Sequence, residues 1–271
     1  MRTTNPALSD KVFNREIEEA RASGSGGRIA RPPVDDQVTP WTPPSSFETM
    51  TVGGTVTATA VLLMLLLAAG FVGWTQVEAT PERLDIPGWL LPTMLVGFGI
   101  ALFTIFKPKL ARFTAPVYAV VEGLLLGAIS HVYQYQYDGI VPQAVGLTLG
   151  VFVLLLFLYA TRVVKVTDKL RTGIIVATGA VFLVYMVSLV LRLFGGNVPF
   201  IHDTGAIGIL FSVAVVVIAS MNLLLDFDFI EKGAAQGAPK YMEWYGAFGL
   251  LVTLVWLYLE LLRLLSKLRS R

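Results

Sequence analysis

The chain has 271 residues, of which 55% are hydrophobic and only 15% are charged. Soluble domains carry about a quarter charged residues, so this composition excludes an ordinary soluble protein and indicates a membrane protein. The net charge of +2 is too small to favour a nucleic-acid partner, and the lack of cysteine excludes disulfides, thiolate metal sites and cysteine nucleophiles.

The first 50 residues are polar and rich in Pro, Gly and Ser. Within them, Ser9 could cap a short helix that runs through Ala22, and the segment from Gly24 to Pro44 is expected to be extended or disordered. The favoured interpretation of residues 1–50 is a flexible cytoplasmic tail, and a docking motif is the alternative. No signal peptide is expected, because the first apolar run is too long for a cleaved one.

Seven long apolar stretches follow the tail, and a membrane-spanning helix needs about 20 apolar residues. The connections between them are short, so residues 51–268 are expected to form one bundle. Ser, Thr, Gly and Ala recur inside the stretches, as close helix packing in lipid requires. We therefore predict an all-α membrane protein with seven transmembrane helices, at about residues 52–75, 88–106, 116–134, 139–161, 171–194, 204–229 and 244–265.

The distribution of lysine and arginine predicts how the bundle is oriented. Basic residues concentrate in the second, fourth and sixth connections, whereas the first, third and fifth hold only Arg83 and Arg192. This pattern predicts a cytoplasmic N-terminus, and seven crossings then place the C-terminus outside. Arg263, Lys267 and Arg269 prefer the inside, so a last helix that crosses incompletely is the alternative; a full crossing is favoured.

Acidic residues inside the predicted spans are the main candidates for function. Asp226 lies about one turn inside the cytoplasmic end of the sixth span, and Glu122 lies roughly 10 Å into the third. A carboxylate in lipid is costly and usually marks an ion or proton route. Two carboxylates at one depth could share a proton, and their oxygens suit a hard cation such as Ca²⁺. We predict that Asp226 and Glu122 form a pH-sensitive ion pathway and a Ca²⁺ site.

Each acidic residue also has a structural interpretation. Asp226 could cap its helix or pair with Lys232 of the following loop. Asp228 is a third candidate for the ion pathway, but it is closer to the surface, so a side chain that faces water is the favoured interpretation. Glu260 stands three residues before Arg263, and a local ion pair between them is the favoured interpretation.

The remaining polar residues are expected to be structural. Arg192 is predicted to reach the outer interface, while His131 and His202 are expected in outer loops without a metal. Gly123 and Gly127 form a small-residue pair that favours helix packing. No metalloprotease, serine hydrolase or phosphate-binding motif is present. We therefore expect neither enzyme activity nor a cofactor, apart from Ca²⁺ as a bound or permeant ion.

Three motifs in chain order resemble those of the Bax inhibitor family. They are EGLLLG at residues 122–127, LDFD at residues 225–228 and LYLELLR at residues 257–263. The resemblance covers about residues 51–268, and it is closest to the YccA-like bacterial members of the actinobacterial branch. It implies a bundle in a bacterial plasma membrane with the last helix at its centre.

The resemblance also implies a pH-sensitive Ca²⁺ leak, as in some members, and modulation of the membrane protease FtsH, as in the YccA type. In leak-forming members an acid of the sixth helix pairs with an acid of the seventh, and Asp226 matches the first. Counting back from Arg263 selects Thr253 for the second position, whereas the motif selects Glu260, so Glu122 is the preferred partner. Two functions stay open: a cation leak, and a non-conducting regulator that binds a membrane protease or another membrane complex.

Overall fold

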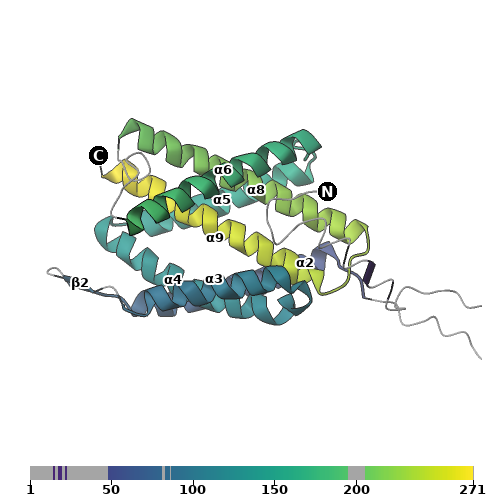
Figure 1. Ribbon diagram of the computed structural model, residues 1–271, viewed down its shortest axis with the longest axis horizontal. Coiled ribbons are helices and arrows are strands. Elements are labelled where there is room, and N and C mark those ends of the chain that lie inside the picture. The colour runs from purple at the N-terminus through teal and green to yellow at the C-terminus, as the bar shows by residue number, and fades with distance from the viewer. Residues whose placement is uncertain are drawn as a thin grey trace, which may run out of the picture.

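A computed structural model describes residues 15, 18, 19, 22, 48–80, 83–85, 87–194 and 205–270. A short hairpin of β1 (Glu78–Thr80) and β2 (Arg83–Asp85), which the sequence did not predict, connects the first two long helices (Figure 1). The 3-10 turn η3 (Pro108–Leu110) precedes the third. The long helices of the described residues are α2 (Val52–Thr75), α3 (Leu90–Phe106), α4 (Ala111–Gln136), α5 (Ile140–Ala160), α6 (Asp168–Leu193), α8 (Ala206–Ala235) and α9 (Met242–Arg269).

The helical content confirms an all-α membrane protein that crosses the bilayer several times. Within the described residues, six helices are long and apolar enough to span a membrane, and α3 is the shorter apolar helix beside them. With 17 residues, α3 falls below the length of about 20 that a perpendicular span requires. It begins two residues later than predicted because the chain enters it from a turn at Gly88 and Trp89.

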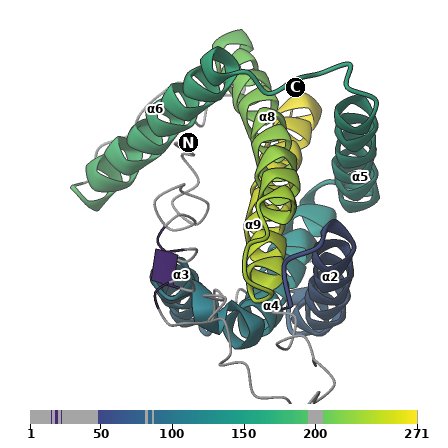
Figure 2. The same cartoon turned by 90° about the vertical axis from the view of Figure 1, so that its right-hand side faces the viewer.

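Helix α9 lies at the centre of the bundle. Of its most apolar 18-residue stretch 67% is buried, against 17–50% for the other five spans. Its main neighbours are α8, α2, α5 and α4, whereas α3 packs chiefly on α4 and α6 chiefly on α8. Figure 2 shows α8 and α9 between α6 on one side and α2 and α5 on the other.

Several helices extend further than their apolar sequences predict. Helix α8 continues through Glu231 and Lys232 to Ala235, six residues beyond the predicted end of the sixth span. Asp226 therefore lies nine residues before the end of its helix, about 14 Å along the axis. Glu122 lies eleven residues after the start of α4, about 16 Å along it. Both acids are deeper in the bundle than the sequence indicated.

Helices α2 and α4 pack closely because both present glycines at the contact. A Cβ atom added to Gly123 would collide with the carbonyl oxygen of Leu66, and one added to Gly127 with that of Gly70. In the other direction, a Cβ atom on Gly73 would collide with the backbone of Leu124. The predicted packing role of Gly123 and Gly127 is thus confirmed.

We predict that Gly123→Val destabilises the bundle by at least about 1–3 kcal/mol, because α2 and α4 would have to separate. The matched control is Gly150→Val on α5, where nothing lies within 4 Å of an added Cβ atom. Thermal unfolding in detergent should show a lower midpoint for the first variant and an unchanged midpoint for the second. Equal midpoints for the two variants would contradict the packing argument.

Candidate functional site

One face of α6 carries polar side chains that point into the bundle. Arg171, Thr178 and Tyr185 are spaced by seven residues, so they form a single stripe with only a slight drift around the helix. Each is hydrogen-bonded to another helix: Arg171 to Asp228 of α8, Thr178 to Asn222 of α8 and Tyr185 to Glu260 of α9. We call this contact between α6, α8 and α9 the polar seam.

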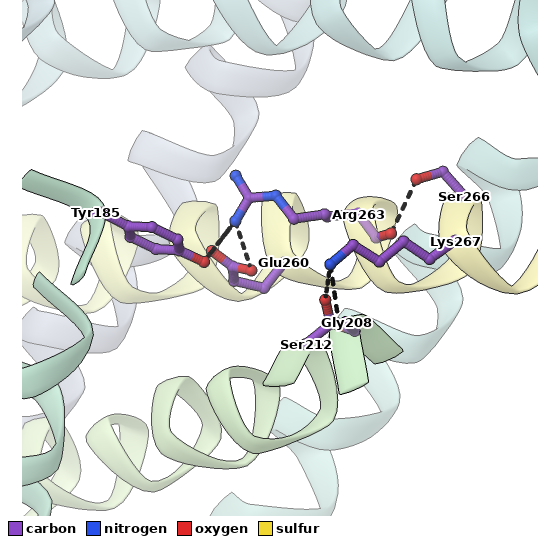
Figure 3. A network of polar contacts seen from close by, with 7 residues as sticks. All are labelled: Tyr185, Gly208, Ser212, Glu260, Arg263, Ser266 and Lys267. Carbon is purple, nitrogen blue, oxygen red and sulfur yellow. Dashed lines mark hydrogen bonds and ion pairs between the residues drawn. The ribbon is translucent and has the colours of Figure 1, made fainter. Parts of the chain in front are cut away.

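The seam continues along the contact between α8 and α9. The Lys267 ammonium donates to the Ser212 hydroxyl at 2.9 Å and to the Gly208 carbonyl at 3.0 Å (Figure 3). Both helices rise 1.5 Å per residue and run in opposite directions. From the Lys267–Ser212 contact, two steps of seven residues back along α9 reach Thr253, and two such steps forward along α8 reach Asp226. These two residues therefore lie at the same level of the bundle.

Asp226 is buried in this part of the seam, with 1% of its surface exposed. The loop partner considered for it, Lys232, instead donates to Asp228 at 2.7 Å. Thr253 is also buried, and its hydroxyl donates to the carbonyl of Gly249 one turn earlier. Thr253 and Glu260 were the two candidates for the α9 position that pairs with Asp226. The register of the two helices places Thr253, and not Glu260, level with Asp226.

Asp228 does not face water, so that expectation was wrong. Its side chain is 8% exposed, and the carboxylate is ion-paired with Arg171, itself 8% exposed, and with Lys232. The physical reason is that α8 continues past the predicted boundary and that Arg171 belongs to α6 rather than to the preceding loop. A guanidinium and a carboxylate buried together satisfy each other, whereas either alone would be costly.

Glu260 forms the ion pair that the sequence favoured. Arg263 Nη1 donates to both carboxylate oxygens of Glu260 at 2.9 Å, and Glu260 is 2% exposed. The Tyr185 hydroxyl donates to Glu260 at 2.8 Å, and the Arg263 guanidinium lies 5.1 Å from the centre of the Tyr185 ring. Figure 3 shows Tyr185 approaching this pair from α6. The local pair is therefore also a contact between α6 and α9.

Glu122 lies on α4, whose main neighbours are α2, α3 and α9. Its carboxylate faces Gly97 of α3, where the missing side chain leaves it room. Among the described residues, no group of three or more His, Asp or Glu side chains is arranged to hold a metal. The pairing of Glu122 with Asp226, and a Ca²⁺ ion bound between them, stay predictions.

The two histidines do not share one environment. His131 belongs to α4 rather than to a loop, and its ring stacks on that of Trp74 with centroids 4.8 Å apart. Its Nδ1 atom is hydrogen-bonded to the Trp74 carbonyl at 2.8 Å. This contact binds α4 to the end of α2. His202 and the side chain of Arg192 lie outside the described residues.

The start of α2 is tied to the loop between α8 and α9. Glu243 is 5% exposed, and its carboxylate accepts from the backbone N–H and the hydroxyl of Thr51 at 2.9 and 2.8 Å. The Met50 N–H donates to Ala238 at 2.7 Å, and Thr49 forms an isolated bridge with Pro239. Glu243 was not predicted as a contact residue, although an acid in the first turn of a helix is a recognisable signal.

A second contact joins the tail to the connection between α3 and α4. The Lys109 ammonium lies 2.6 Å from the carboxylate of Glu19, and its hydrogen bond lowers the pKa of that carboxyl. The lowered pKa means that the charged contact is present at neutral pH and is lost as the pH falls through the pKa of bound Glu19. Lys109, one of the basic residues in the second connection that orient the bundle, therefore also contacts the tail.

A protein-family model described as Bax inhibitor 1 like matches residues 5–270 of the chain. The match includes most of the N-terminal tail, whereas the resemblance in the sequence began at about residue 51. Comparison with curated proteins gives no significant match.

We predict that Arg171→Met destabilises the fold by about 3–5 kcal/mol, because Asp228 is left buried beside Lys232 alone. The double variant Arg171→Met, Asp228→Leu should recover most of this loss, since it removes both buried charges. Lys169→Met, on the exposed face of the same turn, is the control. Thermal unfolding in detergent measures all three. A single variant as stable as the control would show that the ion pair contributes little.

Proposed function

The chain belongs to the Bax inhibitor family, and on that premise we propose that it is a pH-sensitive cation leak of a bacterial plasma membrane. Asp226 is proposed as the pH sensor, with Glu122 as its partner and Asp228 at the cytoplasmic end of the pathway. Thr253 and Glu260 are accessory groups on the central helix. No enzymatic step and no cofactor are part of this proposal, and Ca²⁺ is the proposed permeant ion.

The observation that carries the proposal is the length of the polar seam. Polar contacts extend from Arg171–Asp228 near one end of the bundle to Lys267–Ser212 near the other, and the residues that α6 and α9 contribute recur at seven-residue intervals. Such groups are expensive inside a membrane unless they pair or line an aqueous route. A bundle needing only stability could use apolar side chains at these positions.

The ion pairs support a closed state of the proposed pathway. Arg171 neutralises Asp228 at one end of the seam, and Arg263 neutralises Glu260 nearer the other. A cation passing between the helices would have to displace these guanidinium groups from their carboxylates. Protonation of an acid in the seam weakens its attraction to a neighbouring cation, which gives pH a direct physical route to opening.

The contacts of the basic residues near the end of α9 also support its proposed crossing. Arg263 pairs with Glu260, and Lys267 donates inside the bundle, with only 4% of its surface exposed. Arg269 donates to the Asp138 carbonyl and to Gln143. Cations that are bound to groups of the protein are weak topology signals, so seven crossings with the C-terminus outside are compatible with the loop charges.

We predict that Asp226→Asn abolishes the pH dependence of Ca²⁺ efflux from liposomes, because the amide cannot change its charge. Glu122→Gln should have the same effect if the two acids act as a pair, and a smaller one if Asp226 acts alone. A Ca²⁺ indicator dye in the external buffer measures efflux between mildly acidic and mildly basic pH. Asp168→Asn, an exposed acid in the first turn of α6, is the control.

Two results would argue against this assignment. Wild-type liposomes with no more efflux than protein-free ones would exclude the leak itself. A pH-dependent efflux that persists in the Asp226→Asn, Glu122→Gln double variant would exclude these two residues as the sensor.

A second candidate function is a non-conducting regulator of a membrane protease of the FtsH type. It is favoured by the family match, which begins at residue 5, and by the contact of Glu19 with Lys109. A leak through the helices needs no such tail. A regulator could use the tail to present a surface to another membrane protein.

We predict that deletion of residues 1–47 separates the two functions, since a leak should survive it and docking should not. The deletion stops before Glu48 because Glu48 and Met50 bond with the loop between α8 and α9, and Met50 is buried. Ca²⁺ efflux and the turnover of a membrane substrate by a co-reconstituted FtsH-type protease are measured on the same preparation. Full efflux with lost control of turnover would assign regulation to the tail.

A further inference from the structure

A groove of about 460 Å³ lies against the centre of the bundle, away from the polar seam. Its walls are exposed side chains of α2 and α5, including Phe71, which is 72% exposed, and Leu149, which is 51% exposed. Its floor consists of buried side chains of α4 and α9, among them Leu254 and Tyr258. The groove therefore gives the surroundings of the bundle direct access to its central helix.

The hydroxyl groups in the lining are already satisfied by the protein. The Ser130 and Tyr258 hydroxyls are hydrogen-bonded to each other at 2.6 Å, and the Thr148 hydroxyl donates to the Ala144 carbonyl at 2.7 Å. A polar ligand would have to compete with these bonds, whereas an apolar one would leave them intact. The chemistry of the groove thus selects an apolar occupant.

The dimensions and surroundings of the groove narrow the occupant further. Along α2 the lining extends from Leu63 to Trp74, about 16 Å of helix. Both wall helices, α2 and α5, are membrane spans, so the groove opens toward hydrocarbon. A second helix with its side chains is at least about 10 Å across. A length of helix that matched the groove would therefore fill more space than the groove encloses. An extended hydrocarbon chain has the appropriate width and length.

The end of the groove nearest the membrane surface carries groups suited to a phospholipid head. Trp74 lies there with its ring stacked on His131, and tryptophan favours the interface between membrane and water. The guanidinium of Arg269, an exposed residue, is held by the Asp138 carbonyl and by Gln143 at the start of α5. Val141 of that same turn lines the groove. A phosphate at this level would meet a positive charge and the N-terminal end of a helix.

We propose that the groove binds one acyl chain of a membrane phospholipid, with the lipid phosphate at Arg269. The lipid is a ligand of the central helix and not merely part of the surrounding bilayer, because its chain lies in a groove whose floor is formed by α9. Of the floor residues, Leu254, Val255 and Tyr258 each keep 6–9% of their surface exposed. This site is independent of whether the protein conducts ions.

The test uses the full chain in phosphatidylcholine vesicles with a small fraction of phosphatidylglycerol that carries a diazirine on one acyl chain. After illumination, mass spectrometry locates the lipid adducts. We expect adducts on the α9 residues that line the groove, which are Leu251, Leu254, Val255 and Tyr258. Val145→Phe fills the groove and should reduce these adducts severalfold, as should Leu149→Phe. Val153→Phe, on the exposed surface of α5 outside the lining, should leave them unchanged.

Other outcomes would overturn the proposal. Adducts confined to exposed positions such as Leu67 and Phe71, with none on α9, would mean ordinary surrounding lipid only. Cross-links between two copies of the chain at this face would mean that a second protein occupies it. Arg269→Gln should lower the adduct yield on α9 severalfold; an unchanged yield would overturn the placement of the phosphate. Each readout is covalent labelling, so it does not depend on ion efflux.

Discussion

The arrangement of α6, α8 and α9 depends on one constraint: a charge buried in this bundle must meet an opposite charge or a hydrogen-bonding partner. Arg171 requires Asp228, Glu260 requires Arg263 and Tyr185, and Lys267 requires acceptors on α8. Because these groups repeat every seven residues, satisfying one of them largely fixes the register of the others. A slip of one residue would turn the stripe of α6 by about 100° and separate these pairs. Polar pairing thus specifies a contact that apolar packing alone would leave free to slide.

The other half of the bundle is specified by shape rather than charge. Helices α2 and α4 approach until the glycines of each meet the backbone of the other, a contact that tolerates no added side chain. Lipid offers no hydrophobic drive for helix association, so close van der Waals packing has to supply it. Helix α9 lies between these two regions and packs on both. This position explains why it is the most buried span although it carries charged residues.

Of the seven spans predicted from the sequence, six are long apolar helices within the described residues. The helix-packing glycines and the Glu260–Arg263 pair were also predicted, because each depends on residues close together in the chain. It placed the end of α8 too early, since Glu231 and Lys232 look like loop residues until Arg162, Tyr159 and Asp228 are seen to pair with them. The seven-residue spacing of Arg171, Thr178 and Tyr185 is present in the sequence but was not part of the prediction, in which basic residues near the helix ends served only to orient the bundle. The groove could not be predicted, because it is formed by four helices whose relative positions the sequence does not state.

The two faces of α9 contact different parts of the bundle. At 100° per residue, Thr253 and Glu260 lie on nearly the same side of the helix, while Leu251 and Tyr258 lie about half a turn away. The first pair faces the polar seam, and the second forms part of the floor of the groove. The central helix therefore separates the polar seam from the apolar groove, and each of its two faces is matched to a different kind of neighbour. A substitution on one face changes polar pairing, whereas a substitution on the other changes apolar packing, although both lie on a single helix.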